Sequence, residues 1–427
     1  MLCFGAAVRR WQHGAMSAAD RAHLVSSDVR DHNLGLVLTS LDRGGPAARA
    51  ELAAETGLTR GAVTSLASEL LGHRLVRACT TQKPPTSLGR PLERLELDGA
   101  LFAVVGAQVE VDEVMVLALD VAGRTLYRRT IALRTPFGDA AAVAELVADA
   151  ISACYRELAD RAVIPLSLDV VVPGPVQKGS DTVAYAIDLG WTDVPFGRLV
   201  ADRLPAGPTE VRLSGDGQPA AYAEFVALRD EPGFEGLTDI LYLKSGTGIG
   251  GGVVNSGRVL EGTRGRIFPA GHIVVEPGGL PCLCGRRGCL VTVADPELVI
   301  QHAGLSPLRD TDGLPAALDE LVARIEAAEP AALTAAADAF EHIRTALDTF
   351  VMVYEPQVVV LGGWLAPFTA ELSRLPPATL EWVGVGAHVG EQAFVAARVG
   401  AFAALQGALT RAREAALASP MRSGLLA

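Results

Sequence analysis

Three of the six cysteines in this chain lie within eight residues of one another, shortly after a histidine. The four residues are His272, Cys282, Cys284 and Cys289. One imidazole and three thiolates suit a tetrahedral Zn²⁺ ion, and a site with four protein ligands is structural rather than catalytic. Gly285 and Gly288 would let the chain fold back around the ion. The alternative is a coincidental cluster of reduced cysteines. We therefore expect a zinc-bound loop here.

The remaining cysteines are scattered, and we expect no signal peptide at the start of the given sequence. Cys79 and Cys154 are expected to be small apolar residues, and Cys3 lies near the start. In a cytosolic chain, clustered cysteines are metal ligands more often than disulfide partners. No apolar run reaches the roughly 18–20 residues that span a bilayer. The apolar start is followed, not preceded, by arginines, unlike a signal peptide. We expect a cytoplasmic protein.

Charge divides unevenly along the chain. Residues 1–98 carry 12 basic and 10 acidic residues, a net charge of +2, whereas residues 99–427 carry 25 and 39, a net charge of −14. An acidic surface repels DNA phosphate, so any DNA contact must come from the first part. We expect a disordered leader at 1–23 (with Met16 as an alternative start), a head at 24–98 and a body at 99–427.

Apolar residues at helical spacing organise the head. The first stripe is Leu34, Leu36, Val37, Leu38 and Leu41. A short helix is expected over 48–56, and a third, burying Val63, Leu66, Leu70 and Leu71, over 60–71. Gly57 supplies the turn between them, and Thr59 is suited to cap the third helix. Helix, glycine turn and helix are typical of the helix-turn-helix motif, whose last helix enters the major groove.

Polar residues on the third helix, and a hairpin after it, are candidate DNA contacts. The exposed face is expected to carry Arg60, Thr64, Ser65 and Ser68. Such groups contact base edges and phosphates, although the alternative is an ordinary solvated helix face. Two alternating segments, 74–77 and 91–97, indicate a β-hairpin wing. Arg90 at its base is placed to reach a minor groove; the alternative is a turn arginine without a ligand.

The body alternates strands with helices, which indicates an α/β fold. Strands are expected at 101–105, 114–118 and 168–172, with a helix at 140–158. The second half repeats the theme, with a strand at 240–244, a helix at 331–353 and a strand at 358–361. A glycine-rich turn, 245–252, follows one strand; its Gly246, Thr247 and Gly248 offer donors to an anion. Gly-rich turns are common, so this signal is weak alone.

Together these residues resemble the ROK family (repressor, open reading frame, kinase), and specifically its transcriptional regulators. The most specific match is Gly271-His272 with Cys282-Leu283-Cys284 through Cys289-Leu290. Support comes from 172–176, 189–191 and 355–363 in the body, and from 50–59 and 89–91 in the head. The resemblance covers residues 24–415. It implies a winged helix-turn-helix joined to a two-lobed, actin-like (ribonuclease H-like) ATPase fold, with a ligand cleft between the lobes, in a homodimer or homotetramer.

The resemblance also implies that the kinase machinery has decayed. Asp216 matches the family's catalytic Asp, although an Asp between glycines is first of all a turn residue. Where the kinases read Asp-x-Gly-x-Thr, this chain has Gln108 to Asp112. Glu110 would place a carboxylate near the phosphates, where like unit charges about 4 Å apart repel by about 4 kcal/mol at an effective dielectric near 20.

The sugar pocket is altered as well. Gly215, Pro269 and Val291 stand where the family has an Asn and two Glu residues, while Asp216 and His272 remain. Each lost hydrogen bond to a charged group would be worth about 1.5–3 kcal/mol. We therefore expect no ordinary binding of an unmodified hexose, and the effector to be different, weaker or absent.

Three functions fit these residues. The first is a DNA-binding regulator, more naturally a repressor, whose body dimerises on a palindromic operator and senses a carbohydrate-related effector. The second is an active sugar kinase with an accessory head, favoured by the intact glycine turn and Asp216. The third is a structural or partner-binding remnant. Glu110, Pro269 and Val291 favour the first over the second.

Overall fold

The chain divides into two compact units. The structure is a computed structural model that describes residues 26–80, 93–205, 210–265, 268–374 and 393–426. One unit runs to Asp98 and also contains Ala415–Ala427; the other is Gly99–Glu414. The sequence assigns 415–427 to the body, whereas these residues pack with the first unit. The expected leader lies outside the described residues.

Three helices and a two-stranded sheet make up most of the first unit. They are α1 (Ser26–Gly44), α2 (Arg49–Thr56), α3 (Arg60–Gly72), β1 (Val76–Thr80) and β2 (Glu93–Leu97). The apolar stripe of α1 packs inward at Leu34, Val37, Leu38 and Leu41, all at most 3% exposed. Leu36 and Leu71, also expected in the core, are only half-buried. The two strands are antiparallel, with Val76 opposite Leu97.

The end of the chain packs on α1 within this unit. The Met421 N–H donates to Asp31, which is only 5% exposed, at 2.7 Å. Arg422 pairs with Asp28 at 2.7 Å. The carbonyl of Ala418, the last residue of α13 (Ala403–Ala418), lies so close to Gly35 that a Cβ there would be 2.1 Å from its oxygen. The first unit is therefore built from both ends of the chain.

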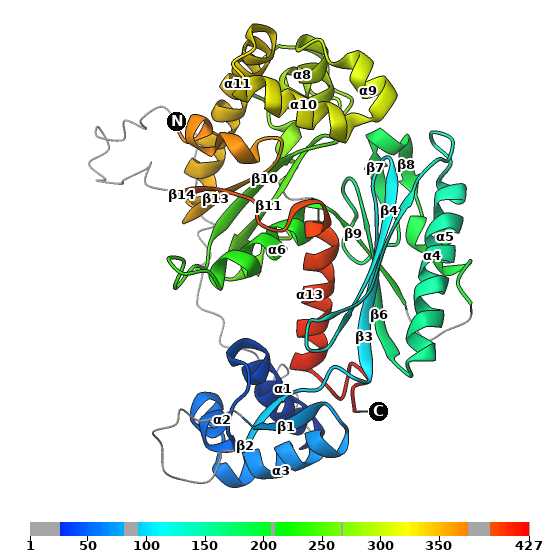
Figure 1. The fold of residues 1–427 in the computed structure, drawn as a ribbon, viewed down its shortest axis with the longest axis vertical. Helices are drawn as coiled ribbons and strands as arrows, with labels where there is room; N and C mark the ends of the chain where they lie inside the picture. Colours follow the sequence, from blue (N-terminus) through cyan, green and yellow to red (C-terminus); the bar gives the residue numbers. More distant parts are fainter. Residues whose placement is uncertain (1–25, 81–92, 206–209, 266–267, 375–392, 427) are drawn as a thin grey trace, which may run out of the picture. The chain divides into compact units, whose positions relative to one another are not determined.

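The body contains two five-stranded sheets of the same topology (Figure 1). The first has the order β5-β4-β3-β6-β9 and the second β12-β11-β10-β13-β14. In each, an antiparallel meander precedes two strands that run parallel to its first strand. The expected repetition of an α/β theme is confirmed. The strands are β3 (Phe102–Val109), β4 (Glu113–Asp120), β5 (Thr125–Ala132), β6 (Ile164–Val172), β9 (Val211–Gly215), β10 (Ile240–Ser245), β11 (Ile249–Asn255), β12 (Arg258–Val259), β13 (Val358–Gly363) and β14 (Ala393–Ala396).

Helices cover the sheets and form the rest of the two lobes. In the first lobe, α4 (Ala140–Asp160) buries an apolar face against the sheet, and a small hairpin, β7 (Val183–Ala186) and β8 (Trp191–Val194), precedes α5 (Phe196–Ala201). In the second lobe, α11 (Pro330–Tyr354) buries ten residues in the main core. The other helices there are α6 (Gly217–Arg229), α7 (Val291–Ala294), α8 (Pro296–His302), α9 (Ser306–Asp312), α10 (Leu314–Glu326) and α12 (Thr369–Leu372). None of the described helices is both long and apolar enough to cross a bilayer.

Candidate functional site

A polar face on α3 is the first candidate site. Gly57, at φ 72°, ends α2, and two residues later the Thr59 hydroxyl accepts the N–H of Ala62 at 3.2 Å and so caps α3. Val63, Leu66 and Leu70 then face the core. The predicted contact residues Arg60, Thr64, Ser65 and Ser68 are all exposed.

The hydroxyls of this face are already engaged as donors. Thr64 donates to the carbonyl of Arg60, and Ser68 donates to that of Thr64, each at 2.8 Å. Their oxygens keep lone pairs that point away from the helix backbone, so in this rotamer they are acceptors. The face therefore offers acceptors from Thr64 and Ser68, and either role from Ser65.

Arg60 differs from its basic neighbours in its charge environment. Four other arginines of the unit pair with glutamates of the same unit: Arg30 with Glu69, Arg49 with Glu93, Arg77 with Glu96 and Arg94 with Glu51. Within the described part of the chain, no carboxylate forms an ion pair with Arg60. Its guanidinium is therefore available to a phosphate. Arg90, the expected minor-groove contact, lies outside the described residues, between β1 and β2.

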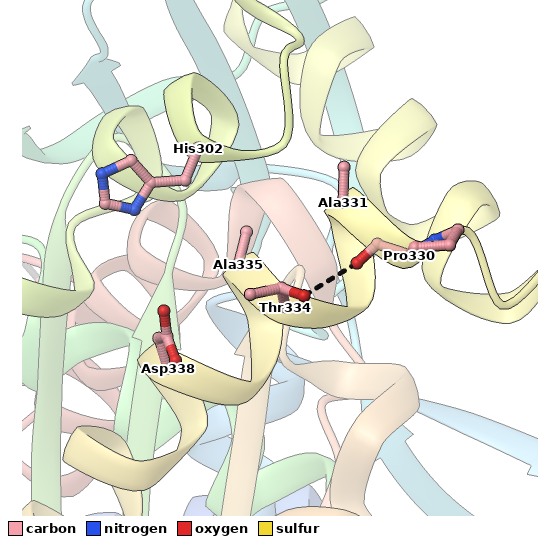
Figure 2. A pocket seen from close by; sticks show the side chains of 6 residues that line it. All are labelled: His302, Pro330, Ala331, Thr334, Ala335 and Asp338. Carbon is pink, nitrogen blue, oxygen red and sulfur yellow. Dashed lines mark hydrogen bonds between the residues drawn. The ribbon is translucent and has the colours of Figure 1, made fainter.

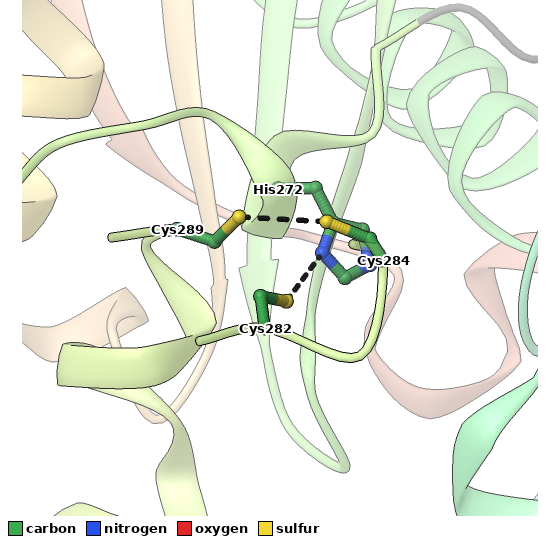
Figure 3. A group of neighbouring side chains, drawn as sticks. All are labelled: His272, Cys282, Cys284 and Cys289. Carbon is green, nitrogen blue, oxygen red and sulfur yellow. Dashed lines mark hydrogen bonds between the residues drawn. The ribbon is translucent and has the colours of Figure 1, made fainter. Parts of the chain in front are cut away.

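The second candidate site is a cluster of one histidine and three cysteines (Figure 3). One ligand atom from each of His272, Cys282, Cys284 and Cys289 lies within 4.8 Å of the others. The Cys284 and Cys289 Sγ atoms are 3.6 Å apart, and His272 Nδ1 is 3.5 Å from Cys282 Sγ. Zn–S bonds of about 2.3 Å in a tetrahedron separate two sulfurs by about 3.8 Å. The four side chains thus fit a single Zn²⁺ ion.

The backbone around the cluster explains how distant residues meet. A bridge between Val274 and Cys289 brings the end of the loop back to its start. Gly288 has φ 72°, and a Cβ there would lie 1.7 Å from the carbonyl oxygen of Glu276, so only glycine fits. Burial, and then the charge of Arg286, lowers the pKa of His272. The imidazole is therefore neutral near pH 7, as a metal ligand must be.

The glycine turn and Asp216 form a third group, in the body. Gly246, Thr247 and Gly248 lie between β10 and β11, and the Gly246 N–H donates to the Gly248 carbonyl at 3.0 Å. Asp216 directly precedes α6, which packs against β11: a Cβ on Gly217 would be 2.1 Å from the carbonyl oxygen of Gly251. The predicted ligand residues are thus set on adjoining elements.

The structure shows what surrounds the three positions where the resemblance implies polar groups. A Cβ on Gly215 would lie 2.5 Å from the carbonyl oxygen of Gly174, so this backbone admits no larger residue. Pro269 is exposed and precedes the short 3₁₀ turn that carries His272. Val291 packs so closely on Gly271 that a Cβ there would be 2.4 Å from its methyl group. Packing therefore accounts for Gly215 and Val291, whereas no contact accounts for Pro269.

Lys244 is a residue near this group that the sequence analysis missed. Its Nζ is 4.0 Å from a carboxylate oxygen of Glu110. Glu110 is therefore not an uncompensated charge, and the repulsion estimated from it alone is too large. A lysine that ends the otherwise apolar run Ile-Leu-Tyr-Leu before a glycine turn was the available signal.

None of the candidate site residues described above lines the shallow pocket between α8 and α11 (Figure 2). It is lined by His302, Pro330, Ala331, Thr334, Ala335 and Asp338. The Thr334 hydroxyl donates to the carbonyl of Pro330 at 2.9 Å, and His302 and Asp338 are exposed. The pocket therefore offers no convergent set of groups for chemistry.

Comparison with known families decides what the body is. The family model described as ROK family matches residues 104–415, well over half of the chain. The chain belongs to the ROK family. A solved structure with the same fold is a ROK family transcriptional regulator, a homologue of the E. coli MLC protein: 21% identical, TM-score 0.69, covering 93% of this chain and 98% of the other. The coverage extends the likeness in fold to the first unit as well as the body.

Curated relatives of this ROK protein include both kinases and regulators. Glucokinase of Halalkalibacterium halodurans is 29% identical over 46% of this chain and 61% of its own length. Kanosamine kinase of Amycolatopsis mediterranei is 30% identical over 50% and 67%. The regulator NagC of Escherichia coli is 24% identical over 65% and 66%. The match thus spans about two thirds or less of each relative, and the family alone does not choose between catalysis and regulation.

Proposed function

We propose that this ROK protein is a sequence-specific DNA-binding transcriptional regulator, more naturally a repressor, with a winged helix-turn-helix at 24–98 and a sugar-kinase-like body at 99–427. The observation that carries the proposal is α3: a capped helix after a tight glycine turn, with a polar exposed face and an Arg60 that forms no ion pair with any described carboxylate. Such a helix docks in the major groove and reads base edges. Arg60, Thr64, Ser65 and Ser68 are the contacts, with Arg90 in the minor groove.

The body supplies dimerisation and sensing. A homodimer or homotetramer presents two heads to a palindromic operator in the cytoplasm. A carbohydrate-related effector would contact Asp216, His272 and the glycine turn at Gly246, Thr247 and Gly248. It acts by binding one arrangement of the body more tightly than another. The fold likeness to a ROK regulator over 93% of the chain supports this division of labour.

Zinc is proposed as a structural ion in this account. His272, Cys282, Cys284 and Cys289 would hold it and supply all four ligands, which leaves no open position for substrate. Bound there, zinc would join the loop at 274–289 to the 3₁₀ turn at Ala270–His272. Because His272 is also a proposed effector contact, this would hold one wall of the effector site in place.

An active sugar kinase is the alternative, favoured by Asp216, the intact glycine turn and the two kinase relatives at 29–30% identity. Against it, Gln108 and Glu110 replace residues of the first phosphate loop, and Pro269 and Val291 offer no hydrogen bond to a sugar. A coupled assay for ADP release with a panel of hexoses distinguishes the two. Steady turnover with any sugar would favour the kinase; we expect none above background.

The test of the proposal is selection of genomic DNA fragments by the purified full chain. We expect a small set of fragments to be enriched that share a palindromic sequence. The variant Arg60→Ala/Thr64→Ala should lose the enrichment, whereas Arg324→Ala, on the surface of α10, should keep it. Random recovery of fragments by the wild type would refute the proposal.

A further inference from the structure

A buried amide lies where the two lobes of the body meet α13. Gln108 is only 1% exposed, although the rest of β3 is apolar. Burying an amide is costly unless its hydrogen bonds are satisfied. The Leu405 N–H donates to Gln108 Oε1 at 2.9 Å, and Gln108 Nε2 donates to the Glu110 carboxylate and, at 3.4 Å, to the Ala401 carbonyl. Gln108 thus ties β3 to the start of α13.

Glu110 continues this network into the second lobe. It lies in the turn after β3 and faces Lys244 on β10, with 14% and 26% of the two side chains exposed. Lys244 lies over the glycine turn, since a Cβ on Gly246 would be 3.1 Å from its Cε. Burial raises the pKa of Glu110, and the Lys244 ammonium opposes that shift. The pair is therefore shielded from solvent and set directly beside the turn.

Helix α13 packs against both lobes (Figure 1). Leu405 and Leu409 belong to a core cluster with β3 and β4 of the first sheet. Ala404 and Ala408 belong to a cluster with α6, β10 and β13 of the second lobe. The fit is tight, because a Cβ on Gly407 would be 1.8 Å from the carbonyl oxygen of Pro219 in α6. A shift of the start of α13 would therefore disturb the packing of both lobes.

We propose that Gln108, Glu110 and Lys244 form a latch beside the glycine turn, which joins both lobes to α13 without any ligand and closes the turn to the phosphates of a nucleotide. The inference rests on the proposed function, in which residues 108–112 no longer serve a kinase. The latch excludes nucleotide by filling the space beside the glycine turn with an internal ion pair. It also makes the lobe arrangement independent of ATP, so that only an effector changes it.

Hydrogen exchange of the full chain, followed by mass spectrometry on a peptide spanning 401–409, tests the latch. We expect slow exchange in the wild type, unchanged by millimolar Mg²⁺ with the ATP analogue AMPPNP. Gln108→Ala removes the acceptor of the Leu405 N–H, and Lys244→Met removes the ion pair with Glu110 that supports Gln108, so each should accelerate exchange in this peptide by about tenfold. Arg324→Met, which breaks the half-buried ion pairs of Arg324 with Glu320 and Glu329 at α10, is the matched control and should leave the exchange unchanged.

Protection by the nucleotide analogue, or unchanged exchange in Lys244→Met, would overturn the latch. If Lys244→Met does not fold, Glu110→Gln, which preserves shape and removes the charge, replaces it and should accelerate exchange in the same peptide. If Lys244→Met and Glu110→Gln both fold, the variant that combines them should exchange no faster than Lys244→Met alone. Additive acceleration would show that Glu110 and Lys244 do not act together. The wild-type chain's selection of DNA is measured separately, so the latch can fail while the proposed function stands.

Discussion

A single carboxyl group, that of Asp295, makes the stability of the body depend on pH. Its side chain accepts the Glu297 N–H at 3.0 Å and caps α8. Burial, with smaller contributions from the charges of Asp188 and Glu297, raises its pKa to about 6. Because the folded form holds its proton to higher pH than the unfolded form, stability is lost as pH rises from about 4 to 6.

The substitution Asp295→Asn should remove that loss, since an amide also caps a helix but does not ionise. We expect the variant to be more stable than the wild type by about 2 kcal/mol at pH 7.5, and equal to it near pH 4. Urea unfolding monitored at both pH values measures this difference. A variant that is equally destabilised at the two pH values would show that the carboxyl group is not held protonated.

At the scale of elements, we expect the loop from His272 to Cys289 to depend on a bound zinc ion. Wild-type protein should carry one zinc ion per chain by elemental analysis, and Cys284→Ser should carry less than about a tenth of that. Cys79→Ser, in β1 and outside the cluster, is the matched control and should retain the ion. Wild-type protein without zinc, or full retention in Cys284→Ser, would contradict the site.

Helix α1 depends on the last residues of the chain. Alanine normally stabilises a helix relative to glycine by roughly 0.5–1 kcal/mol. At Gly35, however, the added Cβ would meet the Ala418 carbonyl oxygen at 2.1 Å, so we expect Gly35→Ala to destabilise the first unit by about 1–3 kcal/mol.

The control is Gly61→Ala on α3, where the added Cβ would meet nothing within 4 Å. It should keep or slightly raise stability. Thermal unfolding of both variants in the full chain measures the contrast. If Gly35→Ala were as stable as the wild type or more stable, the close contact between Gly35 and the Ala418 carbonyl would be contradicted.

Elements set by local pattern were predictable from sequence, and those set by distant packing were not. The spacing of Val63, Leu66 and Leu70 fixed the buried face of α3, and the cysteine spacing indicated the cluster that the structure brings together. The contact between Glu110 and Lys244 joins residues more than a hundred positions apart, so no local pattern reveals it. The packing of residues 415–427 on α1 was missed for the same reason.

At the scale of the whole molecule, charge is divided between a nearly neutral first part of the chain and an acidic remainder. The net charge of −14 on residues 99–427 disfavours contact of that part with DNA phosphate, so under the proposed function we expect binding to depend on the first unit. Gly215, Pro269 and Val291, which stand where the resemblance implies polar groups, are the residues on which the proposal of a sensing rather than a catalytic body rests.

Binding of the full chain to one enriched DNA duplex, measured by fluorescence anisotropy at 150 mM salt with excess competitor DNA, tests this account most directly. The wild type should bind with a dissociation constant of about 10⁻⁸ M or tighter. Arg60→Ala/Thr64→Ala should bind at least about tenfold more weakly, and Arg324→Ala should match the wild type. Wild-type binding no tighter than to competitor DNA, or equal binding by the α3 variant, would contradict the account.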